Sequence, residues 1–235
     1  MRSLGVYYRD RSRAEAMDRL YSQFMKPGDL AFDIGSHVGD RISSFRRLGA
    51  RVVAVEPQPA LVRTLRVLNR FRSDVVIEAK AVGRSAGMLT MRLNTANPTI
   101  STASAAFVHA AEGASGWEGQ TWDGSIEVPV TTLDALIAAH GEPAFIKIDV
   151  EGFEEEALAG LSRPVAALSF EFTTIQREVA DACIDRCAAL GYARFNVALG
   201  ESQALGEWRS AVEMQTWLRA LPHSANSGDI YARLV

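Results

Sequence analysis

The sequence predicts an α/β fold built on one mainly parallel sheet, and three observations carry this prediction. Short apolar runs typical of buried strands alternate with amphipathic segments of helical period along most of the chain. Parallel neighbours require crossover connections, so helices are expected on both faces of the sheet. With 235 residues and 48% hydrophobic content, the chain is long enough for one large core. We therefore expect a single domain over residues 1–235, with the last two strands forming an antiparallel edge.

Each expected strand is an apolar run, and each expected helix carries apolar residues three or four positions apart. The expected strands of the main sheet are, in order, 30–35, 51–57, 75–83, 143–152, 165–172, 192–198 and 229–235, with further strands at 87–93 (edge-like) and 126–130. The expected helices are 12–25, 38–48, 59–71, the segment after Thr131 or Thr132, 153–161, 173–191 and 205–220. The helix within residues 1–28 forms an N-terminal helical segment that precedes the first strand.

Prolines, glycines and capping residues set the ends of these elements. Lys26-Pro27-Gly28 ends the first helix, and Gly49 ends the helix over 38–48. Pro57 limits the second strand. In the helix over 59–71, we expect the core-facing residues to be the three leucines Leu61, Leu65 and Leu68.

Residues 94–125 interrupt the alternation with a stretch rich in Ser, Thr, Ala and Gly. A segment of this length without regular structure is uncommon in a compact domain, and it is usually functional or disordered. We interpret it as an insertion that acts as a lid or substrate loop. Trp117 and Trp122 would either stack on a sugar or anchor the loop to the body of the domain, and we favour the second role. His109 would enter the site if the loop closed.

Composition points to a cytoplasmic protein without a membrane span. The formal net charge is −3, which gives no electrostatic drive toward nucleic acid. No apolar run approaches the about 20 residues of a spanning helix, and the N-terminal stretch lacks the apolar segment of a secretory signal. Cys183 and Cys187 are spaced i,i+4, and we interpret them as small apolar groups within a helix.

The turn after the first strand does not suit a phosphate ligand. The P-loop pattern requires a lysine that this turn lacks, and the glycine spacing differs from the dinucleotide fingerprint. Asp33 ends the strand, and Gly35 and Gly39 follow it. A carboxylate there would repel a pyrophosphate and accept from an amine or a hydroxyl. We expect Gly35 to allow close approach of a ligand and Gly39 to allow close packing of helix on strand.

Glu56 ends the second strand, and an acid at that position can accept from both hydroxyls of a ribose. Ligands of open α/β sheets bind beyond the carboxyl ends of the strands, so Asp33 and Glu56 should share one site. Two acids suit a nucleoside that carries positive charge, such as S-adenosylmethionine. An adenine ring would then lie near the end of the third strand.

Five stretches resemble the FkbM family of S-adenosylmethionine-dependent methyltransferases. They are FDIGSHVGD, VVAVEPQP, AVGRSAGMLTM, VPVTTLDAL and FIKIDVEGFEEEALAGL, and they lie in the family's order between about residues 30 and 161. The stretch IKIDVEGFE is the most diagnostic. The resemblance implies a Rossmann-like, seven-stranded methyltransferase fold and O-methylation of a hydroxyl on a sugar or another natural product. Residues 96–125 match the family poorly, and substrate choice would lie there.

The resemblance also implies which residues hold S-adenosylmethionine. The positions it assigns to the methionine end are Asp33, Gly35, Ser36, His37 and Gly39; those beside the ribose are Glu56, Pro57 and Gln58; those near adenine are Lys80 and Ala81; and Asp149 lies at the methyl-transfer centre.

An alcohol is a poor nucleophile, so a base or a metal should assist the transfer. The candidate catalytic residues are Asp149, Glu151 and His37, whose ordinary pKa lies near neutrality. If the strand continues through Glu151, both acids point to the same side; the alternative for Glu151 is a first-turn acid of the next helix. Glu171, at the end of the fifth strand, is a further carboxylate at this edge. No third ligand for a divalent metal is evident, so a metal is not favoured.

A buried Lys147 should pair with an acid. Two other functions remain open on the residues alone. One is an NAD-type oxidoreductase, against which the missing G-x-G-x-x-G pattern argues, and the other is a catalytically silent protein that keeps the cofactor site. The acceptor is expected to be a small molecule or glycan, and neither its identity nor the oligomeric state can be read from the sequence.

Overall fold

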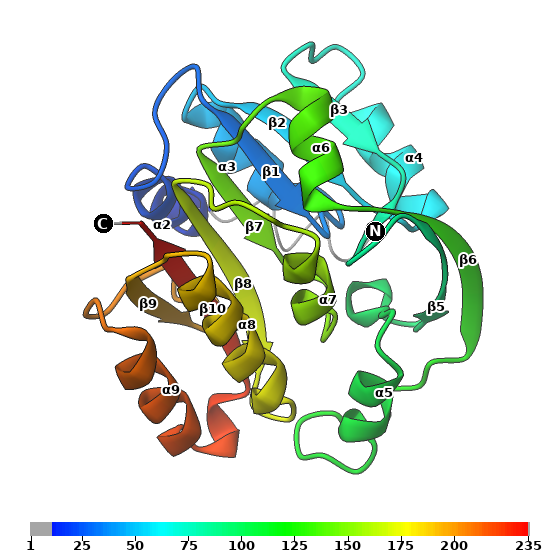
Figure 1. Ribbon diagram of the computed structural model, residues 1–235. Helices are drawn as coiled ribbons and strands as arrows, with labels where there is room; N and C mark the ends of the chain where they lie inside the picture. The colour runs from blue at the N-terminus through cyan, green and yellow to red at the C-terminus, as the bar shows by residue number, and fades with distance from the viewer. Residues whose placement is uncertain (1–10, 235) are drawn as a thin grey trace.

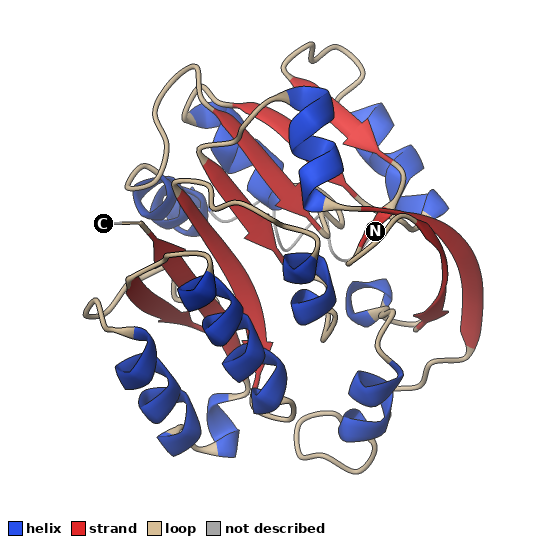
Figure 2. Cartoon of the chain, viewed as in Figure 1, coloured by secondary structure: helices blue, strands red, loops and turns tan. Residues whose placement is uncertain are grey.

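The computed structural model describes residues 11–234 and contains a seven-stranded sheet of order β3-β2-β1-β7-β8-β10-β9. Its strands are β1 (Leu30–Ile34), β2 (Arg51–Val55), β3 (Val75–Glu78), β7 (Phe145–Ile148), β8 (Ala167–Thr173), β9 (Arg194–Leu199) and β10 (Ser227–Arg233). The strands β3, β2, β1, β7 and β8 run parallel, and β10 lies antiparallel between β8 and β9. The sheet crosses the molecule in Figures 1 and 2. The Rossmann-like fold with an antiparallel edge is confirmed.

Helices cover both faces of this sheet, as the alternation predicted. Behind it in Figure 1 lie α2 (Arg11–Tyr21), α3 (Asp40–Arg47) and α4 (Pro59–Leu68), and in front lie α6 (Leu133–His140), α7 (Glu154–Ala159), α8 (Arg177–Ala189) and α9 (Ala211–Ala220). One apolar core forms on each face. Phe32 and Ile146 point into the front core, and Ala31 and Phe145 point into the rear core, so successive strand residues serve opposite layers.

Several element boundaries differ from the expectation. The first helix ends at Tyr21 rather than 25, and the part of the N-terminal segment before residue 11 lies outside the described residues. The last helix starts at Ala211, after a capping box formed by Ser210 and Glu213, so residues 205–210 are not helical. Cys183 and Cys187 are both fully buried in the front core and free, as expected of small apolar groups.

The buried face of α4 differs from the three leucines expected. The helix buries Val62 and Leu65, whereas Leu61 is half-buried and Leu68 is 45% exposed. Val62 and Leu65 are also three residues apart, so the same helical spacing allowed a second face. The packing of the helix on the sheet decides between the two.

The third strand is shorter than expected because the chain leaves the main sheet after Glu78. A second sheet of order β4-β6-β5 forms from β4 (Ala81–Val82), β5 (Gly87–Leu93) and β6 (Gly124–Thr131). Ala81 and Val82 pair parallel with β6, and β5 pairs antiparallel with it. The expected edge strand 87–93 therefore exists, but it borders a separate sheet that curves away from the main one at the right of Figure 1.

The insertion over 94–125 is partly helical. It contains η1 (Pro98–Ile100) and α5 (Ala105–Ala111), whose Ser104 side chain accepts from the Phe107 backbone. Phe107 is fully buried, and the rings of Trp117 and Trp122 contact it edge-on. Trp122 also donates to the Ile100 carbonyl at 2.9 Å. These contacts all lie within residues 94–125, so the tryptophans pack the insertion against itself, and their favoured role as anchors of the loop to the body stays a prediction.

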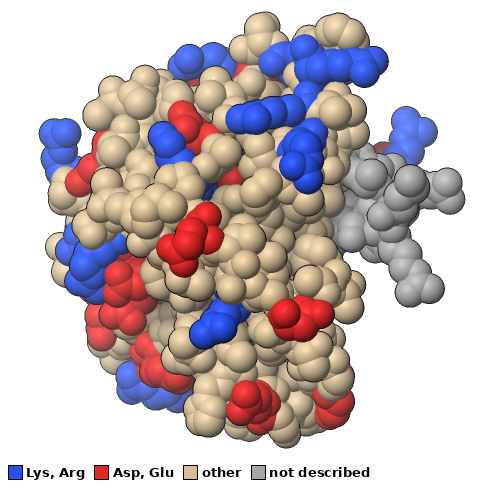
Figure 3. Space-filling model, turned by 90° about the vertical axis from the view of Figure 1, so that its right-hand side faces the viewer, with Lys and Arg blue, Asp and Glu red and all other residues tan. Residues whose placement is uncertain are grey.

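No helix among residues 11–234 is long and apolar enough to cross a membrane. Figure 3 shows the face that carries the small sheet, with basic side chains toward the top and acidic ones more numerous below. Neither sign covers this whole face.

Candidate active site

A cavity of about 150 Å³ opens at the carboxyl ends of β1, β2 and β7, where the strand order reverses between β1 and β7. A second hollow, beside Gln176, measures only about 10 Å³. The sequence-predicted residues that line the larger cavity are Asp33, Gly35, Ser36, His37, Glu56, Pro57, Gln58, Lys80, Ala81, Asp149 and Glu151. Gly39, the remaining predicted residue, does not line it. Strand-end chemistry was therefore a good guide to position, because parallel strands end at one edge.

The glycine turn is shaped by close contacts within the protein. Gly35, His37 and Gly39 all have positive φ, at 84°, 47° and 83°. A Cβ on Gly35 would lie 1.8 Å from the Asp149 carbonyl oxygen, so the glycine is required for the close approach of β1 to β7. Gly39 adopts a left-handed conformation as the N-cap of α3, which by itself favours glycine at this position.

Asp33 is a buried acid with an unused acceptor atom. It is 1% exposed, and its Oδ2 has no hydrogen-bond partner. Burial raises the pKa of Asp33 to about 7, and the like charge of Asp40 adds to the increase. Ser36 donates its hydroxyl to the Asp33 carbonyl at 2.7 Å, which closes the turn. An amine or hydroxyl reaching Asp33 would satisfy an atom that the protein leaves unpaired.

Glu56 is held in place by the backbone. Its Oε2 accepts from the His37 N–H at 3.0 Å, and its Oε1 accepts from the Gln58 N–H at 2.8 Å. Burial raises the pKa of Glu56 to about 7 against these two hydrogen bonds, which favour the ionised form. Each oxygen keeps a second lone pair for a ligand at the cavity. The side chain is thus a fixed pair of acceptors.

The insertion forms one wall of the cavity through Thr99, Ser101 and Ala103. Gln58 donates to the Pro98 carbonyl at 3.1 Å, and Thr99 Oγ1 lies 3.2 Å from His37 Nε2. Lys80 and Ala81 line the cavity where β3 gives way to β4, and the Lys80 ammonium pairs with Glu78 at 3.0 Å. His109 does not line the cavity in this arrangement of the insertion, where its side chain is 88% exposed.

Lys147 lies beneath the cavity between two acids. It is 1% exposed, and its ammonium lies 2.7 Å from Asp229 Oδ1 and 3.1 Å from Asp149 Oδ2. Burial disfavours the charged lysine, but the two carboxylates outweigh this and raise its pKa well above the usual value. The expected pairing of Lys147 with an acid is confirmed, and Asp229 is a partner that the sequence did not indicate.

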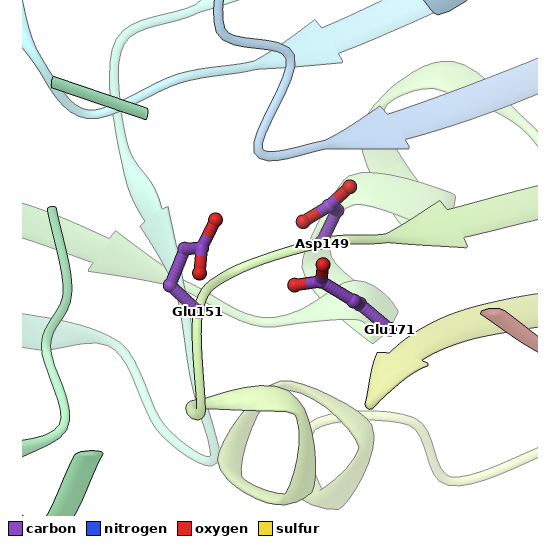
Figure 4. Close-up of side chains that lie close together, drawn as sticks. All are labelled: Asp149, Glu151 and Glu171. Carbon is purple, nitrogen blue, oxygen red and sulfur yellow. The ribbon is translucent and has the colours of Figure 1, made fainter. Parts of the chain in front are cut away.

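Asp149, Glu151 and Glu171 bring their carboxylates together at the carboxyl ends of β7 and β8 (Figure 4). One oxygen from each lies within 4.8 Å of the others. β7 ends at Ile148, so the expected strand through Glu151 is wrong. Glu151 instead adopts a positive φ of 56° in the turn before α7, and this turn directs its side chain to the group. Glu151 is also not the first-turn acid of α7; Glu154 accepts there from the Val150 backbone at 2.9 Å.

The three carboxylates differ in how readily they ionise. Burial opposes ionisation of Asp149, but Lys147, Arg41 and a hydrogen bond with Glu171 outweigh it and lower its pKa. Burial and the charge of Asp149 raise the pKa of Glu151 and of Glu171 well above the usual range. Asp149 is therefore the member of the group that ionises most readily.

His37 lies half-buried at the cavity wall. Burial lowers the pKa of its imidazole, although Asp40 and Asp149 act in the opposite direction. The neutral form therefore dominates at neutral pH, and a neutral imidazole can accept a proton.

Sequence reasoning missed several residues that line the cavity. The most prominent is Arg41, the second residue of α3, whose guanidinium contacts Asp40 at 2.6 Å. Leu89 and Met91 of β5 and Phe153 supply apolar surface. A pattern search at strand ends could not find them, because they come from a helix and from the second sheet.

Comparison with known proteins identifies a family. The methyltransferase FkbM domain family matches residues 33–218. A search of curated proteins found no match to this chain. Among solved structures, a TehB-like SAM-dependent methyltransferase from Corynebacterium glutamicum has a TM-score of 0.51 at 11% identity, over 100% of this chain and 94% of that one. That likeness shows the fold.

Two further solved structures are more distant. A precorrin-6y C5,15-methyltransferase from Geobacter metallireducens has a TM-score of 0.48 at 14% identity, over 95% of this chain and 87% of that one. A SAM-dependent O-methyltransferase from Thermotoga maritima has a TM-score of 0.46 at 10% identity, over 96% of this chain and 66% of that one.

Proposed function

The chain belongs to the FkbM family of S-adenosylmethionine-dependent methyltransferases, and from this premise we propose that it methylates a hydroxyl of a sugar or another natural product. The observation that carries the proposal is the placement of three acids, the buried Asp33 and Glu56 and the half-buried Asp149, around one cavity at the switch point of the sheet. The family membership argues against the NAD-type alternative, and a test of methyl transfer decides between an active enzyme and a catalytically silent protein.

The residues of the cavity fit S-adenosylmethionine by their chemistry. The unpaired Oδ2 of Asp33 suits an ammonium group, and the backbone-held carboxylate of Glu56 suits the two hydroxyls of a ribose. Lys80 and Ala81, with the apolar Leu89 and Met91, border the part of the cavity that we assign to adenine. We assign Ser36, His37, Pro57 and Gln58 to the cofactor's surroundings, with Gly35 and Gly39 shaping the turn that presents them.

When bound, the cofactor would supply a methyl group on a sulfonium. An acceptor oxygen in line with the S–C bond would bond to the methyl carbon as that bond breaks. The chain's contribution is to hold the acceptor in that line and to take its proton. Asp149 is ionised and lies at the cavity edge, so we assign it the acceptor's hydroxyl. Glu151 lines the cavity beside Asp149, next to the place that we assign to the acceptor's hydroxyl. His37 is a neutral base that also lines the cavity, and we retain it as the second candidate for the proton.

We also propose that the chain forms a single domain, acts in the cytoplasm and has no nucleic-acid partner. The two cores share one main sheet, which supports the first point. The modest net charge of −3 supports the last.

The cofactor proposal predicts that S-adenosylhomocysteine binds and that Asp33→Asn weakens it by at least about tenfold, since a neutral amide replaces an acid paired with an ammonium. Isothermal titration calorimetry of both proteins measures this. Asp123→Asn, at an exposed position of the insertion, should leave the affinity unchanged. No heat of binding in the native protein would refute the assignment, as would equal affinity in Asp33→Asn. Methyl transfer from labelled cofactor to a panel of hydroxylated acceptors then tests the reaction.

The raised pKa of Glu56 predicts a pH dependence of cofactor affinity. Below about pH 7 the folded, unliganded protein carries a protonated Glu56, which must lose its proton to accept from both ribose hydroxyls. The Kd for S-adenosylhomocysteine should therefore rise by up to about tenfold per pH unit as pH falls below 7, and this contribution should vanish above it. Asp33 on β1 carries the same negative charge as Glu56 when ionised and raises the pKa of Glu56. Its own pKa is also about 7, so both acids titrate over the same pH range.

Glu56→Gln isolates this contribution, because Asp33 and the ligand's own amine titrate in both proteins. The slope of log Kd against pH between pH 5.5 and 7 should be smaller by about one in the variant. Identical slopes would show that Glu56 does not release a proton on binding.

A further inference from the structure

The three carboxylates at the ends of β7 and β8 come from separate parts of the chain. Asp149 follows β7, Glu151 lies in the turn after it, and Glu171 lies within β8. Figure 4 shows all three side chains directed toward a common space. Their nearest oxygens lie within 4.8 Å of one another. The grouping is therefore a product of the fold and not of one acidic run.

Glu151 makes the group more than a set of neighbouring acids. The residue is 9% exposed, and among residues 11–234 no hydrogen bond or ion pair reaches its carboxylate. Its side chain is aimed at Asp149 and Glu171 (Figure 4). A buried polar side chain without a partner is costly and calls for a ligand or ion.

The surrounding charge does not balance the group. Within the described chain, the ammonium that pairs with it is that of Lys147, and this ammonium also pairs with Asp229 at 2.7 Å. Arg41 also acts on Asp149, but it pairs with Asp40 at 2.6 Å, so both nearby cations are shared with acids outside the group. When all three carboxylates of the group are ionised, two added positive charges would offset most of their charge, and carboxylate oxygens are the ligands that hard divalent cations prefer.

We propose that Asp149, Glu151 and Glu171 bind a divalent cation at the edge of the cavity. The inference rests on the proposed function only for its purpose: a bound cation would contact the acceptor's hydroxyl oxygen and lower its pKa. The proton would pass to the neutral imidazole of His37, and the new O–C bond would replace the S–C bond as S-adenosylhomocysteine leaves. The binding itself depends on residues of this chain alone. The sequence showed no third ligand for a metal beside Asp149 and Glu151. In the structure, Glu171 is the third carboxylate.

The span of the oxygens indicates which cations fit. Three oxygens spaced evenly around one cation lie about 1.7 bond lengths apart, which is about 3.6 Å for Mg²⁺ and about 4.0–4.5 Å for Ca²⁺. The three oxygens of the group lie within 4.8 Å of one another, which is closer to the spacing for Ca²⁺. Mg²⁺ or Mn²⁺ requires the side chains to approach one another by about 1 Å more, which rotation of a glutamate side chain provides.

The test is a titration of the metal-stripped full chain with Mn²⁺, followed by electron paramagnetic resonance and repeated with Mg²⁺ and Ca²⁺ in competition. We expect one site, displaced by either competitor, and at least about a tenfold weaker Kd in Glu151→Gln and in Glu171→Gln. Glu155→Gln, which removes an exposed acid of α7, is the matched control and should bind as the native protein does. Equal Mn²⁺ affinity in all four proteins, or no binding in the native one, would overturn the proposal.

A second readout separates a metal site from a structural role. Without metal, Glu151→Gln removes an unpartnered buried acid, so its melting temperature should rise by about 2–4 °C, while saturating Mn²⁺ should stabilise the native protein more than the variant. A variant that loses stability and still gains as much from Mn²⁺ contradicts the proposal. Calorimetry with S-adenosylhomocysteine keeps the two ideas apart: cofactor binding without Mn²⁺ binding refutes the metal alone, and the reverse refutes the cofactor assignment alone.

Discussion

Asp149→Asn is expected to lower kcat/KM for methyl transfer by about 10²–10⁴-fold, the range in which a positioned acid or base contributes. Asp149 is the one carboxylate of its group whose pKa is lowered, by Lys147 and Arg41 against the effect of burial, so it is ionised where the acceptor's hydroxyl must be activated. Asparagine keeps the shape of the side chain and removes the charge. Initial rates with labelled cofactor and an accepted hydroxyl compound measure the effect.

The fold should survive this change, because Lys147 retains Asp229 as a partner at 2.7 Å. The affinity for S-adenosylhomocysteine should change by less than about tenfold, since Asp33 and Glu56 remain in place. Glu155→Gln serves again as the control with native activity. A kcat/KM within about fivefold of the native value would remove Asp149 from the chemistry and leave His37 as the base to examine.

Lys147→Met is expected to reduce the free energy of unfolding by about 3–5 kcal/mol, because it leaves the buried carboxylate of Asp229 and the half-buried one of Asp149 without their shared cation. Methionine has a similar length and no charge, so packing changes little. For a chain of this size the loss corresponds to a fall in melting temperature of about 6–20 °C. Thermal and urea unfolding at pH 7.5 measure it.

The double variant Lys147→Met with Asp229→Asn tests the cause. It should recover part of the loss, since one of the two unpaired charges is gone, and the recovery measures the coupling between the two side chains. Lys26→Met, at an exposed position, should change stability by no more than about 0.5 kcal/mol. If Lys147→Met also stayed within that range, the ion pairs beneath the cavity would not contribute to stability as argued.

The prediction of the fold succeeded where the signal was local. Apolar runs located every strand of the main sheet, and helical spacing located the helices that pack against it. Strands that are buried on both faces require such apolar runs. It failed where packing chose between equivalent readings, as for Val62 over Leu68 in α4, and where the chain changed sheets after Glu78. Neither outcome is written in the spacing of apolar residues.

The sequence by itself determined that Asp33, Glu56 and Asp149 would meet, since residues that follow parallel strands share one edge of a sheet. Only the tertiary structure decided the rest of the site. Glu151 reaches its position through a left-handed turn, and Glu171 joins because β8 lies next to β7. Lys147 finds Asp229, 82 residues away, because β10 inserts antiparallel beside β8. Strand order and turn conformation depend on packing across the whole sheet, and no short stretch of residues encodes them.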